Sequence, residues 1–475
     1  MNRKLIVLNV LSLVLAGCSK PYTVAPKNMD YPQKTRAGVS YVAHQVDLSQ
    51  NAWWKKINDS TLDRLVAQAL ASNNQILGAK ETIKEAQAQL KEAQYAWIPT
   101  LDASGHGFTG GTWNTNITPN GVLAKTSIFS NTSNLRFHGY FSGFTPGYTF
   151  NVLNNVYNIK AARASLAVVE AQTQMTKLSI IAQVTGAYFM LLSQRQQLAI
   201  EQALSHDLKN LQQLERVRFT KGASDIETLT DLEQQLAQEE ARIPQIVMVI
   251  SKNENAIQLL TNHNPGVVKT HASLFALNIN PLLLKSIPSS VLKKRPDIMI
   301  ALNNLKMADA AVGVAYAAFF PTIRLTSLVG DSSVDLVHIL NLGTNFWIAQ
   351  AKANIALINA SSYEKIKATK ASLNATYYDY IQTLRSAFVD VDDNITTVQK
   401  NRATYLFTEK ACSAAKKAYD IAMTQYTAGA KDYRSVMNAK LNLDRAQLSL
   451  VQQKAQLLDS IVQAYTALAG GADLG

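Results

Sequence analysis

The longest regular pattern in the chain is a helical one. Proline is absent from residues 147–243 and from residues 322–475, and glycine is rare in both stretches. Ala, Gln, Leu and Lys predominate there, and apolar residues recur at helical spacing, as at Leu441 and Leu448. A helix over residues 151–219 would be about 100 Å long at the usual rise per residue. Because helices of that length need support from neighbours, the pattern predicts a coiled coil or a helical cylinder and does not distinguish the two.

A second pattern, with a period of two, marks segments rich in glycine and aromatic residues. Residues 99–150 contain eight glycines, and near the end of this segment apolar and polar residues alternate. The alternating positions on one side are Leu135, Phe137, Gly139 and Phe141. The same period follows Pro321 and returns near Phe346. Two strand pairs, four strands per chain, are therefore predicted. Small soluble sheets that cap helices are the alternative, because the signal of each barrel strand is weak.

The two patterns occur in the same order twice. An offset of 222 residues aligns Phe320-Pro321-Thr322 with Ile98-Pro99-Thr100, and an offset of 207 aligns the residues around Gly429 with those around Gly222. Each half is therefore predicted to contain a helix, a strand pair, a long helix, a turn marked by glycine and a further helix. Locally, each of these two glycines indicates a turn or the end of a helix.

The first residues carry an export pattern. A cationic start precedes an apolar run from Leu5 to Leu15, which is too short to span a membrane, for which about 20 residues are needed. Ala16-Gly17-Cys18 follows, with small residues before the expected cleavage point. This arrangement resembles the lipobox of bacterial lipoproteins, in which the cysteine is acylated. We expect residues 1–17 to be a signal peptide and Cys18 to anchor the protein to the outer membrane.

Charge and cysteine content narrow the class of protein. The formal net charge of +12 suggests nucleic acid as a partner, but the Lys and Arg residues are spread singly and no aromatic platform lies among them. Together with the export pattern, this excludes nucleic acid from the expected partners. After Cys18 the only other cysteine is Cys412, so acylation leaves no intrachain disulfide. Cys412 lies among alanines on a predicted helix and is expected to be buried.

Catalytic chemistry is not indicated. The seven histidines are scattered, without an i, i+4 pair for a metal ion, and no glycine-rich phosphate loop is present. Asp390, Asp392 and Asp393 crowd one helical turn, which is interpreted as a solvated charged face. We predict that the protein is not an enzyme, uses no cofactor and binds no metal, and that a partner supplies the energy for any transport.

The predicted strands constrain the assembly. We expect no later apolar stretch to form a transmembrane helix, so a membrane crossing requires strands closed into a β-barrel. Four strands cannot close a barrel, and open sheet edges are not tolerated in lipid. A homo-oligomer is therefore predicted, with helices that continue from the strand ends into the periplasm. The alternative is a lipid-anchored coiled-coil spacer or adhesin without a lumen, which explains the helices and Cys18 but not the strand pairs or the duplication.

Short motifs stand at the landmarks of both halves. They are Leu62 with Leu65 through Ala69-Leu70 and Asn73-Asn74, Arg295-Pro296-Asp297, Ala317-Ala318-Phe319-Phe320-Pro321-Thr322-Ile323-Arg324-Leu325, Gln425-Tyr426-Thr427-Ala428-Gly429, and Ala467-Leu468-Ala469-Gly470-Gly471. Over essentially the whole chain after Cys18, they resemble the TolC-like outer-membrane factor family, in particular its NodT/OprM-like lipoprotein subgroup. The resemblance implies a homotrimer, a shared twelve-stranded barrel and a helical tunnel that tapers at its periplasmic tip. It also implies docking onto a periplasmic adaptor (membrane fusion) protein linked to an inner-membrane pump.

The resemblance further implies a gate at the tip, where the turns at Gly222 and Gly429 would contact the adaptor. The candidate gate residues are Tyr426, Lys431, Glu227, Thr228, Asp231, Ser435 and Asn438. Tyr426 and Lys431 map to side chains that link the inner helix pair to the neighbouring coil, and a Lys431–Glu227 ion pair is chemically sensible. Ser435 and Asn438 stand where family members carry acidic rings, which argues against an acidic constriction, although Asp231 could add negative charge.

These expectations divide the chain as follows: 1–17 signal peptide, 18–58 lipidated N-terminal extension, 59–98 periplasmic helices, 99–150 strands 1 and 2 with an extracellular loop, 151–265 long periplasmic helices, 266–295 equatorial linker, 296–319 periplasmic helix, 320–352 strands 3 and 4, and 353–475 long periplasmic helices. The expected fold class is an α+β membrane protein with a long coiled-coil α-helical barrel, a transmembrane β-barrel completed by a homotrimer, and two internal repeats. The expected function is an outer-membrane exit duct that passively conducts small molecules, such as drugs or other toxic compounds. An exit duct for type I protein secretion is the alternative, because the pump selects the cargo.

Overall fold

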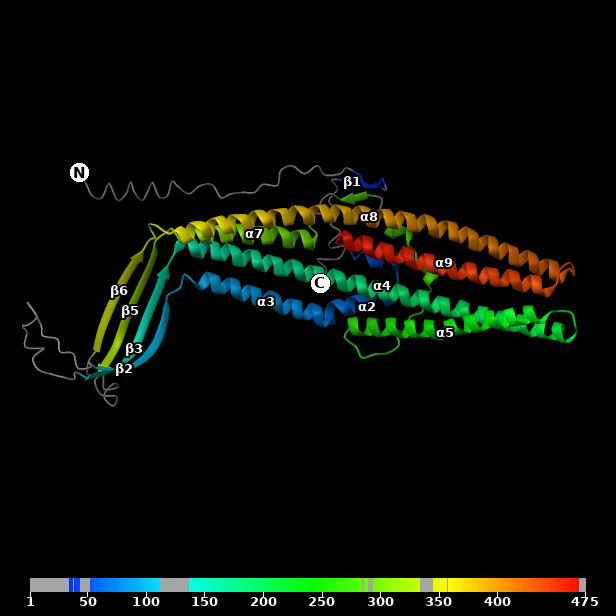
Figure 1. Ribbon diagram of the computed structural model, residues 1–475, viewed down its shortest axis with the longest axis horizontal. Coiled ribbons are helices and arrows are strands. Elements are labelled where there is room, and N and C mark those ends of the chain that lie inside the picture. Colours follow the sequence, from blue (N-terminus) through cyan, green and yellow to red (C-terminus); the bar gives the residue numbers. More distant parts are fainter. Residues whose placement is uncertain are drawn as a thin grey trace, which may run out of the picture. The chain divides into compact units, whose positions relative to one another are not determined.

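The computed structural model describes residues 34–36, 38–42, 52–111, 136–283, 286–288, 294–333, 345–356 and 358–469. The expected signal peptide, Cys18 and most of the expected extracellular loop lie outside the described residues. The helices are α2 Ser60–Ser72, α3 Asn74–Tyr95, α4 Val152–Thr220, α5 Ile226–Leu260, α7 Pro296–Ala317, α8 Ala360–Thr427 and α9 Tyr433–Ala467, with short 3-10 helices η1 Trp53–Ile57, η4 Leu274–Ala276 and η5 Asn280–Leu282 (Figure 1). The strands are β1 Ser40–Val42, β2 Thr100–Gly111, β3 Arg136–Phe150, β4 Ser286–Pro288, β5 Thr322–Ser333 and β6 Asn345–Asn354.

The two halves of the chain contain matching elements, as the repeat predicts. Helices α4 and α8 have 69 and 68 residues, and the helices that follow them, α5 and α9, have 35 residues each. At 1.5 Å per residue, α4 and α8 are each about 100 Å long. In Figure 1, α5 folds back along α4 and α9 folds back along α8. The predicted order of helix, strand pair, long helix, turn and helix is therefore confirmed in both halves.

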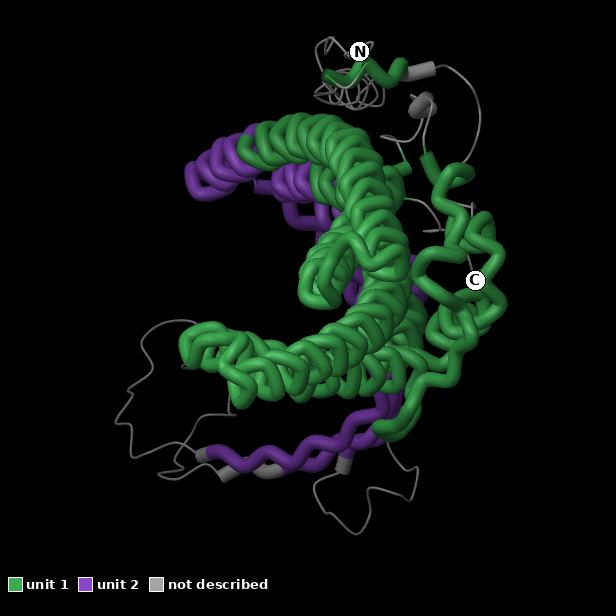
Figure 2. The backbone as a smooth tube through the Cα atoms, turned by 90° about the vertical axis from the view of Figure 1, so that its right-hand side faces the viewer, with its two compact units in different colours: residues 1–86, 165–305, 375–475 green, residues 87–164, 306–374 purple. Residues whose placement is uncertain are grey.

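The chain divides into two compact units (Figure 2), of which unit 1 comprises residues 1–86, 165–305 and 375–475. Viewed along the helices, those of unit 1 stand side by side in a curved layer. The core of unit 1 is built around Trp53, which is 1% exposed and stacks on Tyr465 at 4.7 Å between ring centroids. Nearby, the hydroxyl of Tyr188 donates a 2.6 Å hydrogen bond to Asp59, which also caps α2.

The Arg-Pro-Asp motif at the start of α7 anchors the C-terminal helix within unit 1. The buried guanidinium of Arg295 donates to the carbonyl oxygen of Ala467 at 2.6 Å and to Asp297 at 2.7 Å. It also donates to Asp390 on α8 at 3.1 Å. Burial is the largest single influence on the pKa of Arg295 and lowers it. Asp297 and Asp390 together outweigh burial and raise this pKa above its usual value. Arg295 thus satisfies a terminal carbonyl of α9 that has no partner within its own helix.

Unit 2 comprises residues 87–164 and 306–374 and contains one four-stranded antiparallel sheet in the order β2-β3-β5-β6. Both hairpins of the sequence repeat lie in this one sheet, because β3 of the first half pairs with β5 of the second. At this junction Gly143 lies opposite Gly330, and an added Cβ on Gly143 would lie 2.3 Å from the carbonyl oxygen of Val329. Strands β2 and β6 form the two edges of the sheet.

Several expectations need correction. Helices α4 and α7 each contain an 18-residue window apolar enough to span a membrane, contrary to the expected lack of such stretches; half of the α4 window is buried within the chain, since it contributes to helix packing. The expected linker contains β4, which pairs in parallel with β1 and brings part of the N-terminal extension against it. The aspartate-rich turn is not simply solvated, because Asp390 binds Arg295 and Asp392 accepts a 2.7 Å hydrogen bond from the backbone of Arg36.

Two smaller differences concern the second half of the chain. Strand β6 continues to Asn354, beyond the limit of 352 set from the sequence. Cys412, expected to be buried, is partly exposed on α8. The alternation of apolar positions placed the end of β6 too early because backbone pairing continues beyond the last alternating residue. Cys412 is partly exposed because alanine neighbours on a long helix do not by themselves produce burial.

Candidate channel wall and helical tip

The register of the sheet in unit 2 gives it two unlike faces. Residues directly opposite each other in an antiparallel ladder point to the same face. The apolar face carries Leu101, Ala103, Phe144, Pro146, Tyr148, Ile323, Leu325, Val329, Trp347, Ala349, Ala351 and Ala353, with Thr109, Ser142, Ser327 and Asp331 as polar exceptions. The polar face carries Thr100, Asp102, Ser104, His106, Thr145, Thr149, Arg324, Thr326, Gln350, Lys352 and Asn354, with Phe108, Phe141, Leu328 and Ile348 as apolar exceptions.

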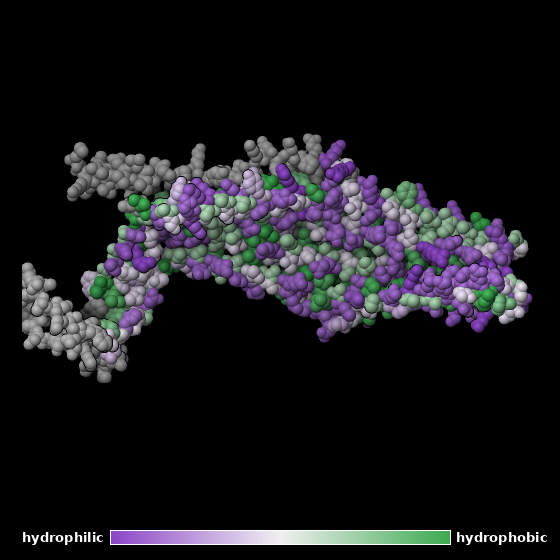
Figure 3. Space-filling model, viewed as in Figure 1, coloured by the Kyte–Doolittle hydropathy of each residue, from purple (hydrophilic) through white to green (hydrophobic). Residues whose placement is uncertain are grey.

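The apolar face is exposed in the single chain. Trp347 is 75% exposed and Leu101 is 66% exposed, although burial of such side chains is favourable in water. Figure 3 shows hydrophobic side chains reaching the surface over the strands and along the helices, between hydrophilic ones. Strands that are apolar on one face and polar on the other, with the apolar face uncovered, are typical of the wall of a transmembrane barrel.

The helix pairs of unit 1 end in two turns with the same backbone geometry. Gly222 and Gly429 both have φ of +73°, a left-handed conformation that favours glycine. The N–H of each glycine donates to the carbonyl oxygen three residues earlier, at 2.9 Å in both turns. The N–H of the following alanine donates to the carbonyl oxygen five residues before it, at 2.8 Å in both turns. Both turns are therefore Schellman motifs, which end α4 and α8 and satisfy their last carbonyl groups.

The helices that follow these turns are capped in the same way. Asp225 accepts a 2.6 Å hydrogen bond from the backbone N–H of Thr228, and Asp432 accepts one of 3.0 Å from the N–H of Ser435. The hydrogen bonds from Thr228 lower the pKa of Asp225, and those from Ser435 lower the pKa of Asp432. Thr228 and Ser435, two of the candidate gate residues, thus act locally as partners of the cap.

A group of charged residues joins the two turns inside one chain. The carboxylate of Glu215, which is fully buried on α4, lies 3.7 Å from Arg218 Nε and 3.7 Å from Arg434 Nε on α9. Ser224 donates a 2.8 Å hydrogen bond to Oε2 of Glu215. Arg218 Nη1 also lies 3.9 Å from a carboxylate oxygen of Asp432. We call Glu215, Arg218, Asp432 and Arg434 the tip cluster.

The structure places the other candidate gate residues on the surface beside the tip cluster. Tyr426 is 41% exposed and its ring lies 5.5 Å from that of Tyr433. Lys431, Glu227, Asp231 and Asn438 are exposed. Within the described part of one chain, Lys431 and Glu227 form no ion pair with each other. The expected pairing, which the resemblance assigns to neighbouring coils, stays a prediction.

The sequence reasoning missed the tip cluster, although the repeat held a signal for it. At the offset of 207 residues Arg434 aligns with Glu227, and Asp432 aligns with Asp225. The two turns therefore share their glycine and their aspartate cap. They differ in charge two residues after that aspartate, where one turn has Glu227 and the other has Arg434. This difference marks Arg434 as a departure from the repeat but does not identify its partner, because Arg434 lies against Glu215 and not against Glu227.

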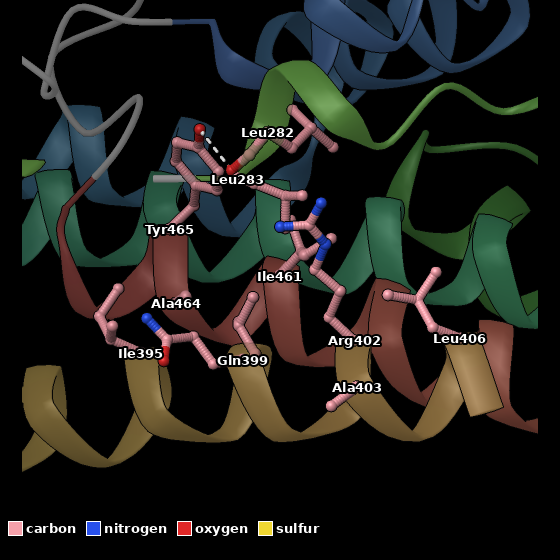
Figure 4. A pocket seen from close by; sticks show the side chains of 11 residues that line it. Leu282, Leu283, Ile395, Gln399, Arg402, Ala403, Leu406, Ile461, Ala464 and Tyr465 are labelled. Atoms are coloured by element: carbon pink, nitrogen blue, oxygen red, sulfur yellow. Dashed lines mark hydrogen bonds between the residues drawn. The ribbon is translucent and has the colours of Figure 1, made fainter. Parts of the chain in front are cut away.

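A pocket of about 340 Å³ lies in unit 1 between α8, α9 and the segment at Leu282 and Leu283 (Figure 4). The hydroxyl of Tyr465 donates a 3.2 Å hydrogen bond to the carbonyl oxygen of Leu282 at its edge. Of the residues that line this pocket only Arg402 is charged. The lining therefore offers no pair of groups for acid–base catalysis. Within the described part of the chain, no group of His, Cys, Asp and Glu suited to a metal ion is found.

Comparisons with known proteins agree with this geometry. The family model described as outer membrane efflux protein matches residues 65–263 and 287–470. The chain is 25% identical over 485 residues to the toluene efflux pump outer membrane protein TtgC of Pseudomonas putida, covering 99% of this chain and 96% of TtgC. It is 26% identical to the cation efflux system protein CusC of Escherichia coli K12, covering 97% and 98% of the two chains. It is also 26% identical to the probable outer membrane lipoprotein SilC of Salmonella typhimurium, covering 98% and 99%.

Among solved structures, the open state of the Neisseria gonorrhoeae MtrE outer membrane channel has the same fold. The TM-score is 0.80 at 21% sequence identity, over 96% of this chain and 99% of MtrE. The match to the family model likewise spans both halves of the repeat. On these grounds the chain belongs to the outer membrane efflux protein family and is the outer-membrane channel component of an efflux system rather than an enzyme.

Proposed function

We propose that the chain is one subunit of a homotrimeric exit duct that conducts small molecules through the outer membrane. The observation that carries this proposal is the sheet of unit 2, which has one apolar face, one polar face and two edge strands, β2 and β6. Edge strands in lipid leave N–H and C=O groups without partners, which costs several kcal/mol for each group. Pairing β6 of one copy with β2 of the next removes both edges. Three copies supply twelve strands, with the apolar face toward lipid and the polar face toward a lumen.

The helices support the same assembly. Large apolar side chains are exposed along α4 and α8 in the single chain: Met175, Met190, Val217, Tyr378, Val389, Leu406, Phe407 and Ile421. Helices about 100 Å long require lateral contacts. Neighbouring copies would cover these side chains and complete a helical tube, to which the curved layer of unit 1 would contribute one part.

Attachment to the membrane through Cys18 is part of this proposal. The lipobox-like Leu15-Ala16-Gly17-Cys18 and the similarity to SilC, a probable outer membrane lipoprotein, support it. A Cys18→Ser variant should lose incorporation of radiolabelled palmitate, whereas Cys412→Ser should retain it. Equal labelling of the Cys18→Ser variant and the unaltered protein would contradict acylation at this position.

The cargo is proposed to be small molecules delivered by an inner-membrane pump through a periplasmic adaptor. The relatives are named for toluene efflux and for cation efflux, so similar ducts serve unlike small molecules. The turns at Gly222 and Gly429, with Tyr426, Lys431 and Glu227 beside them, form the proposed adaptor contact and gate.

The first test combines mass and conductance. Purified full-length protein in nanodiscs should have the native mass of a trimer, and the same preparation should give discrete current steps in planar bilayers. A monomer in lipid would contradict the shared barrel. A trimer shown to be inserted but without current, even after disruption of the tip cluster, would contradict a continuous lumen and favour a spacer.

A further inference from the structure

The polar face of the sheet carries two positive charges directly opposite each other. Arg324 on β5 pairs with Lys352 on β6, and both side chains are exposed. On the other side of β5, Arg324 lies opposite Thr149 of β3. The next residues along the same face are Thr326 and Gln350, which are neutral. The two cations therefore form a basic patch at the end of the sheet where β5 begins and β6 ends.

Neither cation lies opposite an acidic residue in the described sheet, because the ladder partners of Arg324 are Thr149 and Lys352, and that of Lys352 is Arg324. Like charges directly opposite on neighbouring strands destabilise a sheet. On a solvated exterior this patch would have little consequence, because water and salt screen it. On the wall of a narrow aqueous lumen, however, charges of one sign focus the field and raise the local concentration of the opposite ion.

Asp102 on β2 is the acidic residue of the polar face among the described strand residues. It lies opposite Thr145, and its carboxylate is exposed. Where β2 of one copy meets β6 of the next, this carboxylate could neutralise Lys352. Even then Arg324 leaves an excess of positive charge in each subunit. At the tip, Ser435 and Asn438 are uncharged, whereas the acidic Glu227 and Asp231 and the basic Lys431 are exposed.

We propose that Arg324 and Lys352 form a cationic ring inside the barrel that favours anionic solutes, such as carboxylates and phosphates, over cations. This inference rests on the proposed function, because it requires the polar face to line a lumen. Arg324 is the principal residue, and Lys352 reinforces it to the extent that Asp102 leaves it unpaired. The ring favours solutes of one sign of charge as they pass through the lumen, and it does not bind a particular solute.

The test is the reversal potential of the purified full-length channel under an about tenfold KCl gradient, which gives the chloride-to-potassium permeability ratio. The unaltered channel should favour chloride. Arg324→Gln with Lys352→Gln should lower the ratio by at least about twofold, and Arg324→Glu with Lys352→Glu should bring it below that of the neutral variant. Asp102→Asn, on the same face, should shift the ratio in the opposite direction. The preference should also weaken near 1 M salt, where the Debye length is about 3 Å.

Two controls separate charge from folding. Arg324→Lys keeps the charge and should keep the permeability ratio, while Lys56→Gln removes an exposed cation of η1 in unit 1 and should leave the ratio unchanged. Channels that conduct normally but show the same ratio in all variants would overturn the cationic ring and leave the proposed duct intact. Absence of conductance from inserted, unaltered protein would instead overturn the duct itself, and with it the ring.

Discussion

The guanidinium of Arg434 on α9 lies 3.7 Å, measured from Nε to Oε1, from the fully buried carboxylate of Glu215 on α4. This contact joins the tip of one repeat to the tip of the other within a single chain. Arg434 itself is 40% exposed, so screening by solvent weakens its attraction. The buried carboxylate is the critical member, because a charge removed from water depends on its partners.

Replacement of Glu215 by glutamine should loosen the tip. The amide keeps the size of the side chain and can still accept the hydrogen bond from Ser224, but it leaves Arg218 and Arg434 without their shared countercharge. We expect a loss of about 1–3 kcal/mol in the free energy of unfolding, less than for a fully buried ion pair because Arg218 and Arg434 are partly exposed. Thermal unfolding of the purified protein measures it.

The matched control for this change is Glu240→Gln, which alters an exposed glutamate on the neighbouring α5 and should leave the melting temperature unchanged. The same pair of variants tests the role of the tip in protein that has been inserted into a bilayer. Glu215→Gln should raise the frequency of open events in planar bilayers. A melting temperature and an open frequency equal to those of Glu240→Gln would show that the tip cluster does not hold the two turns together.

Gly429→Ala should destabilise the protein although the added methyl group meets nothing within 4 Å. The cost comes from the backbone, because φ of +73° is unfavourable for a residue with a Cβ by roughly 1–2 kcal/mol. Gly78→Ala on α3 is the comparison, since its surroundings are equally open and it lies in a helix, where alanine is favoured over glycine by up to about 1 kcal/mol. Opposite shifts of the melting temperature are therefore expected, and a stabilising effect of Gly429→Ala would refute the turn geometry.

The sequence predicted the features that depend on local chemistry. The glycines at 222 and 429, the absence of proline from α4 and α8 and the period of two in the strands determine backbone shape directly, and these helices and strands lie where the signals place them, although α5 continues through Pro244. Contacts between residues far apart in the sequence could not be predicted in this way. Nothing near Glu215 in sequence indicates that its carboxylate is buried against Arg434, and the aspartates near Asp390 could be interpreted as solvated because Arg295 lies 95 positions away. The apolar face of the sheet emerged only once the register was known, because Phe141, which the alternation placed on the apolar side of its strand, lies on the polar face.

Lys431→Glu should raise conductance if Lys431 binds Glu227 of the neighbouring coil, as the family resemblance implies. Reversing the charge replaces an attraction of about 0–1 kcal/mol for each exposed pair by a repulsion. The double variant Lys431→Glu with Glu227→Lys should restore the original conductance, because the pair is re-formed with its charges exchanged. Lys417→Glu, at an exposed position within α8, serves as the control for a change in net charge. A double variant as conductive as Lys431→Glu alone would remove this pair from the gate.

Glu201→Gln should stabilise the protein, increasingly so at higher pH. Glu201 on α4 is 4% exposed, and burial, followed by the nearby carboxylate of Glu239 on α5, raises its pKa above the usual 4.5. The folded state therefore holds this proton more tightly than the unfolded chain does. As the pH rises above about 4.5, the unfolded chain releases the proton first, and the folded state loses stability until its own raised pKa is passed.

Glutamine has no proton to release, so the Glu201→Gln variant avoids this loss, and Arg242 retains its 2.7 Å ion pair with Glu239. The melting temperature of the variant should exceed that of the unaltered protein by a few degrees at about pH 8, and the difference should vanish at about pH 4, where Glu201 is protonated in both states. Glu240→Gln should show no such dependence, because its carboxylate is exposed. A variant that melts below the unaltered protein at the higher pH would mean that the charged form of Glu201 is stabilised by Arg242, which lies 3.9 Å away, more than burial and Glu239 disfavour it.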